Sequence, residues 1–149
     1  MSGLPKLRSA FHCARALCLI LVSMPVGALA YDPFQYGQAA GMYLAASDLH
    51  IRLSQSKCGY AFKRMPPTYA ARVAEVMRSL RGADRVELEQ FIRSPEFLGK
   101  LSRNQTLIDR SFDKYLSDGL DIKTACGLLV GGLAPVITEG EEAWRRVQK

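Results

Sequence analysis

Cys58 and Cys126 are the residues in this chain whose type and spacing most directly predict a chemical bond. They lie 68 positions apart, and neither belongs to a Cys-x-x-Cys pair of the kind found at redox or zinc sites. An exported protein keeps such a pair oxidised, so we expect one disulfide, which would stabilise the fold by roughly 4 kcal/mol. The alternative is two free thiols with a redox or metal-binding role.

His50 is the histidine that remains beyond the first thirty residues. Asp48 and Ser54 lie close to it in sequence, so a pair formed by a serine nucleophile and a histidine base is conceivable. A catalytic triad depends on side chains that converge in space, whereas these three lie along one predicted helix. We therefore predict no catalytic residue. Methionines at helical spacing, such as Met42 and Met77, are expected to fill the core rather than bind haem or copper, so we predict no cofactor.

A loose acidic series, Asp109, Asp113, Asp118 and Asp121, could suggest a hard cation. A calcium loop needs several oxygens converging around a sharp glycine turn, and this series is too sparse for it. Basic residues stand beside the first two aspartates, so we expect solvent-facing ion pairs and no metal site.

A connector over residues 59–67 combines aromatic and basic side chains. Pro66 and Pro67 prevent a continuous helix there. Aromatic and arginine side chains are enriched at protein interfaces, which makes the connector the candidate partner-binding surface. The candidate residues are Lys57, Tyr60, Phe62, Lys63 and Arg64. Whether Tyr60 and Phe62 are exposed or tucked into the bundle remains open at this stage.

The first thirty residues have the pattern of a cleavable signal peptide. Basic residues come first, an apolar run covers residues 16–22, and Ala28-Leu29-Ala30 matches a signal peptidase site. We therefore predict a signal peptide over residues 1–30, a mature domain over residues 31–149, and a periplasmic or secreted location. An uncleaved anchor is the alternative, although the apolar run is short for a membrane span.

The charge of the predicted mature chain argues against nucleic-acid binding. The full chain has 20 basic and 14 acidic residues. Three basic residues (Lys6, Arg8 and Arg15) precede residue 31 and every acid follows it, which leaves 17 basic and 14 acidic residues and a net charge of +3. A second apolar run, Leu128–Ile137, contains glycines and a proline and is too short to span a membrane, so we expect a buried core segment and no stable membrane insertion.

Helical periodicity dominates the predicted mature chain. The first helix should bury Ala39, Met42, Ala46, Leu49 and Leu53, leave Asp48 on its polar side, and end near Cys58–Gly59 with a glycine cap. Further helices are expected from about residue 67 to Gly82, from Asp84 to about residue 92, and over residues 95–118 with Ser94 as N-cap. The last helical region should start at Asp121 or Thr124 and break near Pro135 or Gly140.

These elements predict an all-α fold, a single small bundle of four to six helices cross-linked by one disulfide. The first helix runs toward its cysteine and the last runs away from its own. The bridge would therefore place the two helices antiparallel, with Leu49 and Leu53 facing residues 129–133. The pairs Gly37/Gly41 and Gly127/Gly131 are expected where helices pack closely.

Three functions fit these features. The first is a non-enzymatic exported protein that binds a protein partner, by analogy with small immunity or inhibitor proteins. The second is a periplasmic chaperone or stress protein. The third is a small enzyme or cofactor carrier that uses His50. We favour the first, with an unknown protein partner, because no catalytic constellation is recognisable in a well-patterned domain.

Overall fold

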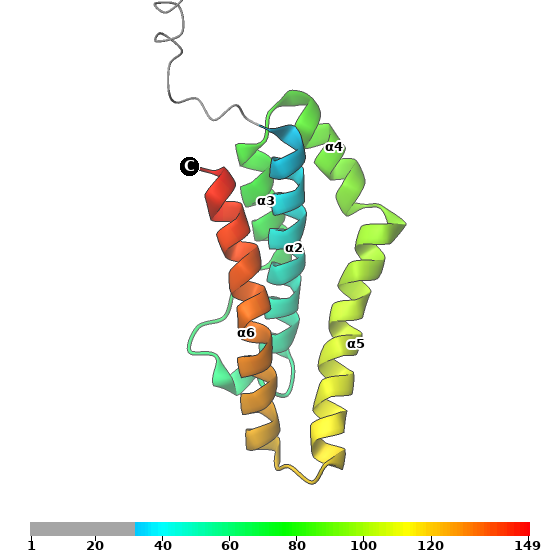
Figure 1. Cartoon of the computed structure of the whole chain (residues 1–149), viewed down its shortest axis with the longest axis vertical. Coiled ribbons are helices and arrows are strands. Elements are labelled where there is room, and N and C mark those ends of the chain that lie inside the picture. The colour runs from blue at the N-terminus through cyan, green and yellow to red at the C-terminus, as the bar shows by residue number, and fades with distance from the viewer. Residues whose placement is uncertain (1–31) are drawn as a thin grey trace, which may run out of the picture. The chain divides into compact units, whose positions relative to one another are not determined.

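The structure, a computed structural model, describes residues 32–149, and these form one compact unit. The predicted signal peptide and its cleavage site lie outside the described residues. Within residues 32–149 the chain forms five α-helices and one short 3₁₀-helix (Figure 1). In chain order the elements are α2 (Pro33–Gln55), η1 (Gly59–Ala61), α3 (Tyr69–Ser79), α4 (Gly82–Ile92), α5 (Pro95–Ser117) and α6 (Ile122–Val147). The predicted all-α bundle is confirmed.

The antiparallel pair of α2 and α6 forms the centre of the bundle, as Figure 1 shows. Close packing of these helices depends on small side chains, and Gly140 is the tightest point. A Cβ atom at Gly140 would lie 2.4 Å from the Cβ atom of Ala46 and 2.9 Å from the carbonyl oxygen of Met42. The predicted antiparallel arrangement of the first and last helices is therefore confirmed, with a glycine at the contact.

The core consists of two clusters along this helix pair. The upper one is built around Trp144, which stacks on Tyr43 with 5.7 Å between ring centroids and meets Tyr36 edge-on at 5.1 Å. The lower one contains Leu49, Leu53 and Leu129, with Leu133 packed against it, as the sequence predicted. It also contains the disulfide, whose two half-cystines are almost completely buried.

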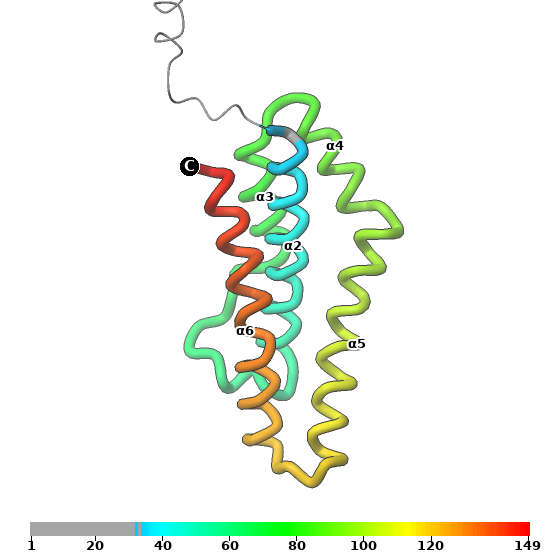
Figure 2. The backbone as a smooth tube through the Cα atoms, in the orientation of Figure 1, coloured from blue at the N-terminus to red at the C-terminus, as the bar shows by residue number. Residues whose placement is uncertain are grey.

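The remaining helices surround the central pair unevenly. In the tube of Figure 2, α3 runs beside α2, and α4 then carries the chain over to α5, which descends on the other side. The hydroxyl of Ser94 accepts a hydrogen bond of 3.2 Å from the backbone N–H of Phe97, so the predicted N-cap of α5 is confirmed. Asp121, rather than Thr124, caps α6. Gly119 has a φ of 87°, which explains why a glycine ends α5.

The end of α2 differs from the prediction. The helix stops at Gln55 instead of continuing to Cys58–Gly59, because the Ser56 hydroxyl bonds to the backbone nearby. This hydroxyl donates to the Leu53 carbonyl (2.6 Å) and accepts from the Cys58 N–H (3.1 Å), in competition with helical hydrogen bonds. Gly59 does not cap the helix; it is required because a Cβ atom there would lie 2.3 Å from the Ser54 carbonyl oxygen.

The start of α4 also differs from the prediction. The helix begins at Gly82, two residues before Asp84, and α3 has already ended at Ser79. Gly82 has a φ of 43°, a conformation in which glycine is favoured. Gly82 therefore opens α4 rather than ending α3.

Helix α6 is continuous, so the predicted break near Pro135 or Gly140 is wrong. A proline removes the hydrogen bond to the carbonyl four residues earlier, here that of Gly131. Both residues are exposed, so water can satisfy this carbonyl. The outer side of the helix thus tolerates the proline without a break.

The outer side of α6 is more apolar than expected. Leu128 and Val136 are 48% and 51% exposed, so the segment predicted to be core is buried only in part, chiefly at Leu129 and Ile137. Among the described residues, α6 is the one helix long and apolar enough to cross a membrane by length and composition, and 17% of its most apolar window is buried. Core helices that are mostly buried meet the same criterion, but most of this window is not buried within residues 32–149.

The predicted role of the glycine pairs is largely wrong. A Cβ atom at Gly37, Gly127 or Gly131 would meet nothing within 4 Å. Of these four positions, only Gly41 lies near another helix: a Cβ atom there would lie 3.2 Å from the Phe91 ring of α4. The close helix contact is made by Gly140 instead.

Candidate functional site

The connector between α2 and α3 (residues 56–68) leaves the lower end of α2 and bulges out beside α6, as Figure 2 shows. Cys58, within the connector, is joined to Cys126 in the first turns of α6, with 5.2 Å between their Cα atoms. The short helix η1 follows directly, and hydrogen bonds from Ala61 N–H to Cys58 O and from Phe62 N–H to Gly59 O close it. The connector is therefore held to the bundle at its start by a covalent bond.

The structure separates the five candidate residues of the connector into three environments. Tyr60 is 63% exposed, and Lys63 and Arg64 are also exposed, so these three form an outward surface. Phe62 is half-buried against the lower cluster. Lys57 is exposed but leans over Phe112 of α5, with its ammonium 5.4 Å from the ring centroid.

Met65, which follows Arg64 in the connector, extends the outward surface. Its side chain is 61% exposed. Residues 49–74 contain five basic residues and no acid, but Arg52 and Arg72 pair with the flanking Asp48 and Glu75. Among the described ion pairs none involves the other basic residues of this segment, which are Lys57, Lys63 and Arg64. We call Tyr60, Lys63, Arg64 and Met65 the connector surface.

His50 does not assemble a catalytic group with its sequence neighbours. Its ring is half-buried and lies 5.3 Å from that of Phe62. Ser54 donates its hydroxyl hydrogen to the Ile51 carbonyl, and Asp48 bonds elsewhere. Burial lowers the pKa of His50 below its ordinary value of 6.5. His50 thus packs as a neutral aromatic side chain that supports the connector through Phe62.

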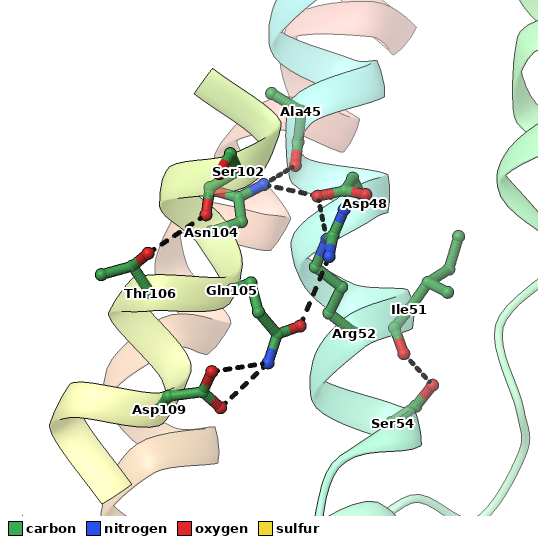
Figure 3. Close-up of polar contacts among 10 residues, drawn as sticks. All are labelled: Ala45, Asp48, Ile51, Arg52, Ser54, Ser102, Asn104, Gln105, Thr106 and Asp109. Carbon is green, nitrogen blue, oxygen red and sulfur yellow. Dashed lines mark hydrogen bonds and ion pairs between the residues drawn. The ribbon is translucent and has the colours of Figure 1, made fainter. Parts of the chain in front are cut away.

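Asp48, which was predicted to lie on the polar side of its helix, is at the centre of a buried polar network. Its side chain is 9% exposed, and it accepts hydrogen bonds from Arg52 Nε (2.8 Å) and Asn104 Nδ2 (2.9 Å), drawn in Figure 3. Asn104 also donates to the Ala45 carbonyl at 3.0 Å. The prediction for Asp48 is wrong because α5 covers this side of α2 and supplies a polar partner.

The network continues toward solvent along α5. Arg52 Nη1 donates to Gln105 Oε1 at 3.3 Å, and Gln105 Nε2 donates to both carboxylate oxygens of Asp109, at 2.9 and 3.0 Å (Figure 3). Asp48 and Arg52 are four residues apart on one helix, which is the sequence signal that could have predicted their pairing. Nothing local in the sequence indicates the contribution of Asn104 and Gln105.

A cleft of about 680 Å³ opens beside this network, between α2 and α5. Its lining is partly apolar and partly charged. The apolar residues are Ile51, Ile108, Phe112 and Leu129. The polar residues are Asp48, Arg52, Gln55, Ser56, Lys57, Gln105, Asp109 and Asp113.

The acidic series has several separate roles. Asp118 pairs with Lys114 at 2.7 Å, and Asp121 caps α6. Asp109 bonds to the neutral Gln105 rather than to a basic neighbour, so the expected ion pair is wrong for this residue. Within residues 32–149, no cluster of three or more histidine, cysteine or acidic side chains could hold a metal ion.

A second polar cluster joins α2 to α3 at the other end of the bundle. Tyr43 donates to Glu75 (2.9 Å) and accepts a short hydrogen bond from Arg72, whose guanidinium also lies over the tyrosine ring. Burial, together with the hydrogen bond to Glu75, raises the pKa of Tyr43 to about 12. A neutral tyrosine is held between the charged groups, which makes this cluster a structural joint.

In comparisons with known proteins, no family model, curated protein or solved structure matches this chain. The described residues present two candidate binding features, the connector surface and the cleft between α2 and α5.

Proposed function

We propose that this protein is a non-enzymatic, exported helical domain that acts by binding a protein partner, in the manner of small immunity or inhibitor proteins, in the periplasm or outside the cell. The connector surface carries the proposal. Tyr60 and Met65 expose more than three-fifths of their surface beside Lys63 and Arg64. Large exposed apolar side chains next to arginine are typical of partner-binding surfaces.

The buried disulfide supports the same proposal. It holds the start of the connector against α6, and Phe62 anchors the next part against His50. A segment that is already held in place loses less conformational entropy when it binds, which favours affinity. Lys57, Lys63 and Arg64 form no ion pair among the described residues, and their positive charge favours a partner with an acidic surface.

The test is a binding titration against a partner captured with the oxidised protein from its own cell extract. The double variant Tyr60→Ala/Arg64→Ala should weaken binding at least about tenfold while its circular dichroism stays unchanged. The matched control is Arg85→Ala/Val86→Ala, which removes one arginine and one exposed apolar side chain from α4. His50→Ala should weaken binding far less than the connector variant does, because the disulfide still holds the start of the connector and the four side chains of the connector surface are kept.

Two results would overturn the proposal. Equal loss of binding in the connector variant and the α4 control would mean that the connector surface is not the contact. Loss of activity in a folded His50→Ala protein, with binding otherwise intact, would favour an enzyme or cofactor carrier.

A chaperone or stress role is the second candidate, and the exposed apolar side chains of α6 favour it. Leu128 and Val136 belong to a stretch from Thr124 to Thr138 that contains no charged residue. Such a surface could bind unfolded chains. The discriminating assay is suppression of aggregation of a denatured client protein at low pH, where a chaperone should act in proportion to its concentration and a partner-specific binder should not.

A further inference from the structure

We propose that the connector is an inhibitory loop for a serine protease that cleaves after arginine, with Arg64 as the side chain that enters the specificity pocket of the enzyme. The inference rests on the proposed function and names the partner class of the same surface. The specificity pocket of such a protease carries a carboxylate. Arg64 is exposed and forms no ion pair among the described residues, so its guanidinium is available to pair with that carboxylate in two parallel hydrogen bonds.

The backbone around Arg64 protrudes and has unused hydrogen-bonding groups. The connector bulges out from the bundle beside α6 (Figure 2), and Lys63, Arg64 and Met65 are all exposed. Within residues 32–149, no backbone hydrogen bond involves the N–H or C=O groups of these three residues. An extended segment that binds along the edge of another protein is held by main-chain hydrogen bonds. The connector therefore offers a protease both a side chain for its pocket and a backbone to pair with.

The loop is fixed on the N-terminal side of Arg64. The disulfide joins Cys58 to the first turns of α6, and the short helix η1 follows directly. Phe62, two residues before Arg64, is half-buried against the lower cluster and lies beside the ring of His50. The chain can therefore move freely only after Phe62.

The loop is also restricted on the C-terminal side of Arg64. Pro66 and Pro67 have fixed φ angles, and Pro66 disfavours a helical conformation at Met65. Thr68 then caps α3, so regular structure resumes directly after the prolines. A loop held on both sides loses little conformational entropy when it binds, which is how a short contact reaches high affinity.

The disulfide distinguishes an inhibitory loop from an ordinary cleavage site, which exposed loops also provide. In acylation the serine oxygen of the protease bonds to the carbonyl carbon of Arg64, the bond to the Met65 nitrogen breaks, and the histidine of the protease protonates the departing amine. Cys58 precedes the cleaved bond and Cys126 follows it, so the disulfide keeps the two fragments joined. The Met65 amine therefore stays close to the acyl group. In the reverse step it attacks the ester, expels the serine oxygen and restores the peptide bond.

The test is titration of trypsin with the purified oxidised protein, with a small chromogenic arginine substrate as the readout. We expect saturable inhibition at a ratio of one to one, with only slow cleavage after Arg64. The cleaved protein should run as one species in electrophoresis until the disulfide is reduced, and as two fragments afterwards. Chymotrypsin has a hydrophobic pocket and should be inhibited at least about a hundredfold less.

Arg64→Ala should raise the inhibition constant for trypsin at least about a hundredfold, because the pocket loses its charged occupant. Arg64→Phe should in addition inhibit chymotrypsin more strongly than the unmodified protein does. Position 64 is exposed, so both variants should keep the fold, which circular dichroism checks. The matched control is Arg78→Ala, which removes an exposed arginine from α3 and should inhibit trypsin as the unmodified protein does.

Three results would overturn the inference: no inhibition of trypsin at about 100 µM protein, rapid and complete cleavage without inhibition, or equal inhibition by the Arg64→Ala variant. The proposed function is tested separately by the captured partner. If Tyr60→Ala/Arg64→Ala weakens binding of that partner while trypsin is not inhibited, the protease inference alone is wrong.

Discussion

Removal of the disulfide should lower the free energy of unfolding by about 4 kcal/mol. The perturbation is the double variant Cys58→Ala/Cys126→Ala, which avoids leaving a lone buried thiol. The bridge joins positions separated by 68 residues, and in the chain-entropy model a loop of that length costs the unfolded chain roughly 4 kcal/mol of conformational freedom at 25 °C. Small domains have a total stability of about 5–15 kcal/mol, so this is a large fraction of the whole.

The sole tryptophan provides the assay. Trp144 is 2% exposed and lies in the upper cluster, away from the bridge in the lower one, so its fluorescence reports unfolding of the opposite end. In urea titration the double cysteine variant should unfold at a lower denaturant midpoint than the unmodified protein. In thermal unfolding its melting temperature should be about 10–25 °C lower. Ser102→Ala, an exposed change on α5, is the control and should alter stability by less than about 0.5 kcal/mol.

The dependence of stability on urea distinguishes this explanation from simple loss of packing. Without the cross-link the unfolded chain expands and exposes more surface, so the m-value should rise. A loss below about 1 kcal/mol with an unchanged m-value would refute the loop-closure reasoning. A large loss with an unchanged m-value would instead assign the effect to the cavity left by the two buried sulfur atoms.

Three further predictions concern single residues. Asp48→Ala should cost about 2–4 kcal/mol in urea unfolding, because Arg52 and Asn104 lose their shared acceptor; a loss below 0.5 kcal/mol would contradict this. Gly140→Val should cost at least about 2 kcal/mol, since its Cβ atom would overlap Ala46, and normal stability would show that the helices separate easily. Burial lowers the pKa of His50 below 6.5, so the folded state resists protonation of this ring. The free energy of unfolding should therefore fall as the pH drops below 6.5, and the fall should be shallower in His50→Gln. Identical pH profiles of the two proteins would refute this.

Local sequence signals predicted most of the elements. Apolar side chains at three- and four-residue spacing, Ser94 as N-cap and Gly119 at a helix end define α5 without reference to any other segment. The same holds for the start of α3 at Thr68, whose hydroxyl accepts from the Ala71 N–H. Such signals act within one turn of the chain, which is why they are legible in the sequence.

The candidate site was predicted only in part. The composition and prolines of residues 59–67 identified the connector, but not which of its aromatic side chains would point outward. Phe62 packs inward beside the ring of His50, whereas Tyr60 points outward and is 63% exposed. The cleft could not be found from the sequence, because its lining comes from three helices far apart along the chain.

The sequence by itself determined most of the helical elements, the caps at Ser94 and Gly119 and the two cysteines able to cross-link them, since each depends on short-range backbone chemistry or on residue type. Only the tertiary structure decided that Asp48 is buried, that Gly140 is the close contact and that Pro135 leaves α6 unbroken. The physical reason is the same in each case. Whether a polar group, a glycine or a missing N–H is tolerated depends on what surrounds it. The surroundings are another helix for Asp48 and Gly140, and water for Pro135.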